Sequence, residues 1–283
     1  MKAIRALALL SAALTISTDA LADCGAPEGR PAIGLALSGG GALGASHIGV
    51  IAVLEELGVP IDCVAGTSMG AIVGGLYASG RSAAALEVTL NEIDWNAVFI
   101  DRPPRQDRDF RRKIEDDGLL LPYRIGVSSD RPALPRGLIL GQNLTLALRR
   151  LSIEAASVRR FDDLPIPFRA VAADIETGEA VVIGAGDIAE AMRASMSVPG
   201  VFPPVEFEGK LPVDGGLANN LPIDVVRAMG ADVVIAVDIP TQLQNRAALG
   251  SVAEIIGQTL SIMIMRSSQA QLASLSDQDI LIA

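Results

Sequence analysis

The sequence predicts an α/β fold with a mainly parallel sheet, built as one domain. Apolar runs of strand length alternate with amphipathic stretches of helix length, which is the pattern of βαβ units. Half of the 283 residues are apolar, and a chain of this length can bury a large core. No internal repeat or low-complexity segment interrupts the alternation.

The first elements occupy the N-terminal third of the chain. We expect a strand over Ile33–Leu37, a helix over Ala45–Leu57, a second strand over Cys63–Ala65 and a second helix over Met69–Ala78. Because parallel strands need a crossover between them, this order favours parallel pairing.

The later elements include the one expected departure from parallel pairing. Phe168–Asp174 and Ala180–Ile183 flank the turn Glu176–Gly178, so we expect an antiparallel hairpin there. Val233–Val237 is a further buried strand, and Val252–Leu275 has apolar residues near the helical period of 3.6.

Both ends of the chain carry signals about its context. Lys2 and Arg5 precede an apolar run over Ala6–Ile16 and the small-residue stop Ala20–Ala22, so residues 1–22 are predicted to be a secretory signal peptide. The chain ends on the apolar, strand-like run Ile280–Ala283. Natural termini are usually frayed and polar, so we expect a domain from a longer protein.

The charge balance argues against nucleic acid as a partner. Removal of residues 1–22 takes away two of the 23 basic and one of the 33 acidic residues, so the net charge changes from −10 to about −11. Such a chain gains nothing from counterion release on a phosphate backbone. The arginines of Asp101–Asp117 could suggest a lipid-headgroup patch, but six acidic residues match its six basic ones. We expect a solvated loop of mixed charge there.

The two cysteines, Cys24 and Cys63, allow three interpretations. In an oxidising compartment they could form a disulfide. Alternatively, Cys63 is a buried thiol in the apolar segment and Cys24 is mobile near the mature N-terminus. An acylated Cys24 is a third reading, which Asp23 disfavours because a lipoprotein site requires a small neutral residue before the cysteine.

A glycine-rich segment, Ser38–Gly44, lies between the first strand and its helix. Its G-x-G-x-x-G pattern fits a dinucleotide-binding loop, and backbone N–H groups at a helix start can also hold an oxyanion. Gly39, Gly40 and Gly41 are the candidate donors. A dinucleotide fold needs an acidic residue at the end of the next strand, whereas Asp62 precedes that strand.

The next strand ends in Gly66-Thr67-Ser68-Met69-Gly70, a G-x-S-x-G sequence that leads into a helix. This context is typical of a nucleophile elbow. Glycines at 66 and 70 remove side chains that would clash in a tight strand-to-helix turn. We therefore predict Ser68 to be a nucleophile.

The base is harder to assign from the residues. The lone histidine, His47, lies on a largely apolar helix, where a neutral packing role is favoured. A carboxylate must then serve, which requires a desolvated site or strong oxyanion donors. Asp174, Asp214 and Asp238 all follow strands, but only Asp214 precedes glycines, Gly215 and Gly216, that make room for a serine and a substrate.

Together these motifs resemble the patatin-like phospholipase family. The resemblance covers about Ile33 to Asp238 and includes the glycine loop, the Ser68 elbow, the Asp214–Gly216 segment and the run Ala194–Pro204. It implies a Ser68–Asp214 dyad without histidine, and a three-layer α/β/α sandwich around a mainly parallel sheet over residues 30–283. It also implies calcium-independent hydrolysis without metal or cofactor.

The resemblance also carries expectations about substrate and setting. Phospholipids or other fatty-acyl esters are the expected substrates, with peripheral membrane contact. The family usually has Arg or Lys where this chain has Leu43, which could alter lipid preference. Similar secreted bacterial members carry this domain ahead of an outer-membrane β-barrel. A non-catalytic lipid-binding module and, less favoured, a dinucleotide-binding protein are the alternatives.

Overall fold

The computed structural model describes residues 24–101, 106, 109–117, 126–128, 131–133, 137, 139–240 and 242–283. The predicted signal peptide, residues 1–22, lies outside the described residues. Within them the chain forms an α/β fold around a seven-stranded sheet.

The main sheet has the order β6-β5-β2-β1-β8-β9, with β7 paired to β5 off this path. Its central pairs are parallel, while β5 pairs with both β6 and β7 in antiparallel fashion. A separate hairpin joins β3 and β4. The strands are β1 (Ile33–Leu37), β2 (Cys63–Thr67), β3 (Gly126–Ser128), β4 (Arg131–Ala133), β5 (Phe168–Asp174), β6 (Ala180–Ile183), β7 (Pro212–Asp214), β8 (Val233–Val237) and β9 (Ile280–Ile282).

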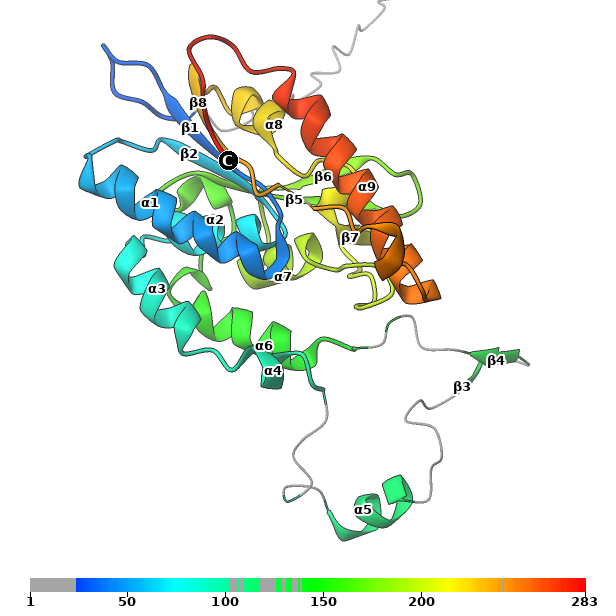
Figure 1. The fold of residues 1–283 in the computed structure, drawn as a ribbon. Coiled ribbons are helices and arrows are strands. Elements are labelled where there is room, and N and C mark those ends of the chain that lie inside the picture. The colour runs from blue at the N-terminus through cyan, green and yellow to red at the C-terminus, as the bar shows by residue number, and fades with distance from the viewer. Residues whose placement is uncertain are drawn as a thin grey trace, which may run out of the picture.

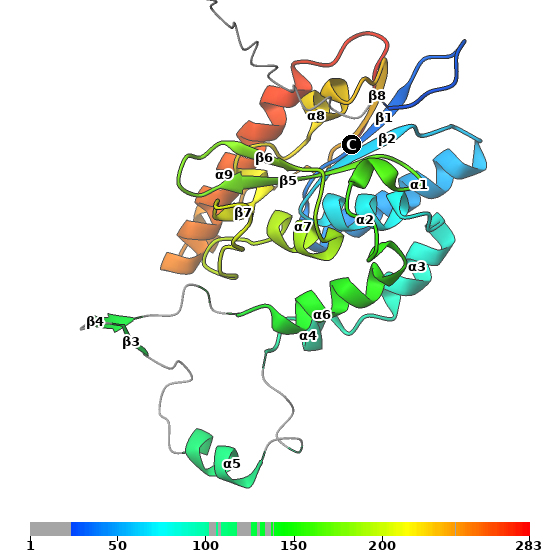
Figure 2. The same ribbon diagram turned by 180° about the vertical axis from the view of Figure 1, so that it is seen from behind.

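Helices cover both faces of the sheet, which makes the three-layer sandwich expected from the sequence (Figures 1 and 2). On one face α2 packs on β2 and β5 beside α1 and α7, and on the other α8 and α9 lie side by side. The α-helices are α1 (His47–Glu56), α2 (Met69–Ala78), α3 (Ala83–Asn91), α4 (Trp95–Val98), α5 (Phe110–Asp117), α6 (Gln142–Leu151), α7 (Ile188–Ser195), α8 (Ile223–Ala228) and α9 (Val252–Leu272). Short 3₁₀ helices are η1 (Gly41–Ser46), η3 (Ile153–Ala155), η4 (Phe161–Asp163), η5 (Gly215–Leu217) and η6 (Arg246–Ala248).

Burial along the strands follows their place in the sheet. All five residues of β2 are buried, because helices cover this central strand on both faces. The edge strand β6 instead alternates exposed and buried residues. The long helix α9 begins at a capping box, in which Ser251 and Glu254 satisfy backbone N–H groups at the helix start.

The structure corrects four of the expected elements. The strand expected over Cys63–Ala65 extends to Thr67 as β2, and the helix expected to reach Leu275 ends at Leu272 as α9. The helix expected from Ala45 begins as α1 at His47, because the glycine loop first runs into η1. Part of the charged segment Asp101–Asp117, expected to be a loop, forms α5. Arg, Lys and Glu are good helix formers, and this local propensity outweighs the mixed charge of the segment. Residues 102–105 and 107–108 of that segment lie outside the described residues.

Cys24 and Cys63 form a disulfide, with a Cα–Cα distance of 5.0 Å. Both side chains are buried beside α8, and the N–H of Cys24 donates to the carbonyl oxygen of Met229. The alternative of a mobile Cys24 and a free buried thiol is therefore wrong. The bridge ties the start of the described chain to the first residue of β2, the strand that leads to Ser68. No helix in the described part of the chain is long and apolar enough to cross a bilayer.

Candidate active site

Ser68 lies at a sharp turn between β2 and α2. Its backbone has φ 53° and ψ −120°, and among the described residues only Glu208 is another non-glycine with positive φ. Such a conformation costs about 1–3 kcal/mol and persists only where the surroundings enforce it. Here the N–H of Ser68 donates to Ser195 Oγ at 2.8 Å, and Ser195 Oγ donates in turn to the carbonyl oxygen of Val171 on β5.

The two glycines of the elbow are required by close backbone approach. A Cβ at Gly66 would collide with the carbonyl oxygen of Gly70. A Cβ at Gly70 would collide with the carbonyl oxygens of Leu37 and Ser38. The turn therefore packs directly against the end of β1, and a side chain at either glycine would force the strand and helix apart.

The pairing of β5 explains why Asp214 meets Ser68. Ala172 of β5 pairs with β6 on one side and with Asp214 of β7 on the other, so β7 lies on the same side of β5 as β2. The last residue of β2, Thr67, pairs with Val171, directly before Ala172. Because β2 runs parallel and β7 antiparallel to β5, their C-terminal ends meet. Ser68 Oγ donates a hydrogen bond to Asp214 Oδ2 at 2.8 Å.

Asp214 is held in a buried position with few partners. Its second carboxylate oxygen, Oδ1, accepts the N–H of Gly216 at 2.8 Å, and its own N–H donates to the carbonyl oxygen of Ser197 at 2.9 Å. Burial raises the pKa of the Asp214 carboxyl to about 6, against the opposing effect of the hydrogen bonds from Gly216 and Ser68. The group is thus a stronger base than an ordinary aspartate. A Cβ at Gly215 would collide with the carbonyl oxygen of Val171, which accounts for that glycine.

The glycine loop approaches Ser68 closely, but its three candidate donors differ. The N–H of Gly39 donates to the carbonyl oxygen of Asn220 at 3.1 Å. Gly39 was expected to be an oxyanion donor, but its N–H is already bonded. A Cβ on Gly39 would lie 3.2 Å from Ser68 Cβ, so Gly39 provides room beside the nucleophile. Gly40 and Gly41 stand at the start of η1, where backbone N–H groups lack an intrahelical acceptor. These two remain candidate donors.

The other candidate bases, His47, Asp174 and Asp238, are hydrogen-bonded to groups other than Ser68. His47 is buried, and its Nε2 lies 2.8 Å from the carbonyl oxygen of Ser38, to which it donates as neutral imidazole. Burial lowers the pKa of His47. Asp174 accepts from Glu176 N–H and Thr177 Oγ1 in the hairpin turn, and Asp238 accepts from Ser268 Oγ. None of the three is bonded to Ser68.

Sequence reasoning gave no role to two residues that hold the site. Ser195 binds the N–H of the strained elbow, and Asn220 binds the N–H of Gly39. Ser195 belongs to the run Ala194–Pro204 that carried part of the family resemblance, so a signal was present without a role attached. Asn220 had no such signal, because its contact joins distant parts of the chain. No group of three metal-ligating side chains occurs among the described residues.

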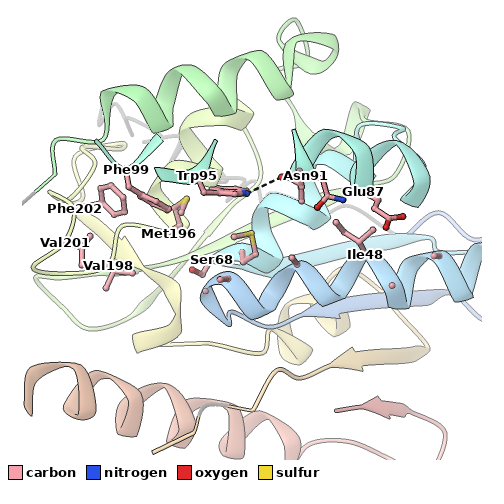
Figure 3. A pocket seen from close by; sticks show the side chains of 17 residues that line it. Ile48, Ser68, Glu87, Asn91, Trp95, Phe99, Met196, Val198, Val201 and Phe202 are labelled. Atoms are coloured by element: carbon pink, nitrogen blue, oxygen red, sulfur yellow. Dashed lines mark hydrogen bonds between the residues drawn. The ribbon is translucent and has the colours of Figure 1, made fainter. Parts of the chain in front are cut away.

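Two cavities open at Ser68. The first, named here the α1–α3 cavity, has a volume of about 660 Å³ and is bounded by α1, α3, α4 and the segment after α7. Figure 3 shows Phe99, Val201 and Phe202 to one side of Ser68, and Asn91 and Glu87 to the other. The second, named the α9 cavity, has a volume of about 400 Å³ and lies between the glycine loop and α9. Gly41, Ser68 and Val198 line both cavities.

Comparison with known proteins gives a consistent match. The family model described as patatin-like phospholipase matches residues 35–227. Patatin-like phospholipase domain-containing protein 6 of Mus musculus is 34% identical over 212 residues, which span 74% of this chain and 14% of that protein. An uncharacterised NTE family protein of Mycobacterium bovis is 34% identical over 209 residues, spanning 74% of this chain and 49% of that protein. The chain thus spans about half or less of the length of these curated relatives.

Among solved structures, VipD from Legionella pneumophila aligns with a TM-score of 0.46 at 17% sequence identity, covering 78% of this chain and 52% of that one. The type III effector ExoU of Pseudomonas aeruginosa aligns with a TM-score of 0.39, also at 17% identity.

Proposed function

The chain belongs to the patatin-like phospholipase family, and we propose that it hydrolyses fatty-acyl esters of lipids through a Ser68–Asp214 dyad. The observation that carries the proposal is the 2.8 Å hydrogen bond from Ser68 Oγ to Asp214 Oδ2, made at a strained elbow beside the glycine loop. A nucleophile bonded to its base in this way has the arrangement needed for covalent catalysis.

In the first half-reaction Ser68 Oγ attacks the ester carbonyl carbon and its proton passes to Asp214 Oδ2. The negative charge that develops on the carbonyl oxygen faces the loop of Gly40 and Gly41, whose N–H groups we propose as oxyanion donors. Removing one such donor typically costs about 10²- to 10³-fold in turnover. The tetrahedral intermediate then collapses, the bond to the alcohol oxygen breaks, and Asp214 returns the proton to that oxygen.

In the second half-reaction water hydrolyses the acyl-enzyme. Asp214, ionised again, accepts a proton from the attacking water, and Ser68 Oγ leaves with that proton as the free fatty acid forms. Burial raises the pKa of Asp214 to about 6, which makes it a stronger base than an ordinary aspartate. Because this pKa is still below 7, the carboxylate is mostly ionised near neutral pH and can accept a proton. The proposed steps use no metal ion, so EDTA should leave the rate unchanged.

The test is hydrolysis of a fatty-acyl ester by wild type, Ser68→Ala and Asp214→Asn, together with fluorophosphonate labelling followed by intact-mass analysis. We expect both variants to lose activity, and wild type to gain one label that Ser68→Ala does not take up. Undiminished hydrolysis by either variant would refute the dyad. A wild-type protein that binds lipid but neither labels nor turns over would instead be a lipid-binding module.

The setting of the enzyme is a further part of the proposal. We propose export directed by residues 1–22, which the Cys24–Cys63 disulfide supports because such bonds persist in oxidising compartments. Expression of the whole chain in a Gram-negative host, with fractionation and N-terminal mass analysis, should find protein cleaved after Ala22. Full-length protein in the cytoplasm would contradict this.

We also propose peripheral contact with a lipid surface. Its support is the exposed apolar side chains of Val252, Ile255 and Ile256 in the first turns of α9. Sedimentation with phosphatidylcholine vesicles should be lost in the triple serine variant of these residues.

A further inference from the structure

The two cavities that meet at Ser68 differ in their relation to the proposed base. Ser68 lines both, whereas Asp214 lines the α9 cavity and not the α1–α3 cavity. An ester that reacts at Ser68 has two arms, the acyl chain and the alcohol. The position of Asp214 can therefore decide which cavity holds the acyl chain and which holds the alcohol.

The path of the proton decides between the two orientations. When Ser68 Oγ forms its bond to the carbonyl carbon, the proton moves to Asp214 Oδ2. When the bond between that carbon and the alcohol oxygen breaks, the same proton must reach the departing oxygen. Proton transfer needs hydrogen-bond reach between the two groups, about 2.6–3.2 Å. The alcohol oxygen must therefore lie on the Asp214 side, at the α9 cavity, and the acyl chain extends into the α1–α3 cavity.

The α1–α3 cavity has the lining that a hydrocarbon chain requires. Trp95, Phe99 and Phe202 supply aromatic side chains. The opposite wall is formed by small residues of η1 and α1, namely Ala45, Gly49 and Ala52. Gly49 and Ala52 are three residues apart in α1 and so lie on one face of that helix, and Ala45 precedes them in η1. At Gly49 an added Cβ would meet no atom within 4 Å, so the groove is open above it.

The α9 cavity is also largely apolar. Leu43, Leu217, Ile239, Leu260 and Ile264 line it, and Asp214 is the one charged residue among the described residues that do so. A cavity of about 400 Å³ with this lining offers no cation to a phosphate but can bury a hydrocarbon chain.

We infer that the α9 cavity binds the alcohol part of the substrate and that this part itself carries a hydrocarbon chain, as in a two-chain lipid. The inference rests on the proposed Ser68–Asp214 reaction. It assigns the acid to one cavity and the alcohol to the other, so the two arms can be tested independently with simple esters.

The experiment uses two soluble series of alkyl esters. In the acid series the methyl esters of progressively longer acids are compared, and in the alcohol series the butanoate esters of progressively longer alcohols. For wild type we expect kcat/KM to rise along both series, by up to about fourfold per buried methylene group. Gly49→Leu narrows the α1–α3 cavity and should flatten only the acid series. Leu260→Trp fills the α9 cavity and should flatten only the alcohol series.

Matched control variants distinguish the filling of a cavity from a general disturbance of the helix that carries the substitution. Val53→Leu places a larger side chain on an exposed position of α1, and Met263→Trp does so on α9, and neither residue lines a cavity. Both controls should keep the wild-type dependence along each series and label at Ser68 with a fluorophosphonate as wild type does. The series that each cavity variant leaves unchanged shows that its reacting groups are intact.

Two results would overturn the assignment while leaving the proposed function intact. In one, the effects of Gly49→Leu and Leu260→Trp are exchanged between the series. In the other, wild type hydrolyses the esters but shows no rise along the alcohol series. Failure of the proposed function looks different: wild type would hydrolyse no ester and would not label, and the inference would fall with it.

Discussion

The elbow of residues 66–70 and the aspartate loop of residues 212–216 carry the two side chains of the proposed dyad, but the fold positions them by different means. The elbow depends mainly on local geometry, because its glycines allow close backbone approach within the turn and to the end of β1. The positive φ of Ser68 lies at the junction of β2 and α2, where Ser195 accepts its N–H. The aspartate loop is positioned from a distance, by the pairing of β7 with β5 and by the carbonyl oxygen of Ser197. Local backbone geometry thus shapes the turn at Ser68, whereas strand pairing places Asp214 and burial raises the pKa of its carboxyl.

The largest expected effect comes from breaking the elbow. Gly66→Ala brings a Cβ against the carbonyl oxygen of Gly70, where backbone and not a flexible side chain must move. We expect a loss of stability of about 3 kcal/mol or more and near-complete loss of turnover, measured by thermal unfolding and by ester hydrolysis. Gly257→Ala is the control, since a Cβ there meets no atom within 4 Å in α9. Wild-type turnover in Gly66→Ala would show that the elbow tolerates a shift.

Replacing Asp214, the proposed base, should lower activity but raise the stability of the fold at alkaline pH. Asp214→Asn removes the proton acceptor, which is expected to lower kcat by about 10²- to 10⁴-fold. Because burial raises the pKa of Asp214 from 3.8 to about 6, the folded state binds more protons than the unfolded state between these values, and the wild-type fold loses stability as pH rises from 3.8 to about 6. The variant should therefore be the more stable protein at pH 8, by on the order of 3 kcal/mol. The difference should vanish near pH 3, below the ordinary aspartate pKa of 3.8, where Asp214 is protonated in the folded and in the unfolded state. Denaturant unfolding at the two pH values measures this, and a variant less stable at pH 8 would contradict it.

A smaller loss of activity is expected from Ser195→Ala, because Ser195 supports the elbow through its bond to the N–H of Ser68. Ser195→Ala leaves the N–H of Ser68 without its acceptor, and an unpaired buried donor costs about 1–3 kcal/mol. If that cost falls on the elbow, kcat should drop by about 10- to 100-fold while KM changes little. Ser197→Ala is the matched control, because its hydroxyl is bonded to Arg193 and to no reacting side chain. Equal losses of kcat in the two variants would show that general loosening of α7, and not the Ser68 contact, is responsible.

The contrast between local and long-range contacts also explains which site residues could be predicted from the sequence. Ser68, Gly66 and Gly70 could be identified from the sequence because the contacts that require the two glycines lie close along the chain or at the end of the adjoining strand. The contact of Ser68 with Ser195, 127 residues away, was not predicted. Asp214 could not be separated from Asp174 and Asp238 with the same certainty, since all three follow strands. The register of β7 on β5 separates them, and it depends on residues forty positions apart.

Other differences between sequence and structure have the same origin. Gly39 was expected to donate to the oxyanion, but Asn220, distant in sequence, accepts its N–H. Likewise, the pairing of Cys24 with Cys63 was left open because it depends on where α8 brings the N-terminal segment. The α/β fold with a mainly parallel sheet was predicted correctly, because the alternation of strands and helices is a local property of the sequence, while the three layers were implied by the family resemblance.

The most direct test of the central claim is the pH dependence of the rate at which a fluorophosphonate labels Ser68. If Asp214 is the base, the rate in wild type should be constant above pH 7 and fall about tenfold per pH unit below a midpoint near pH 6, the pKa to which burial raises this carboxyl. In Asp214→Asn the residual rate should show no such midpoint. A midpoint near pH 6 that survives in Asp214→Asn would assign the activation of Ser68 to another group and contradict the account.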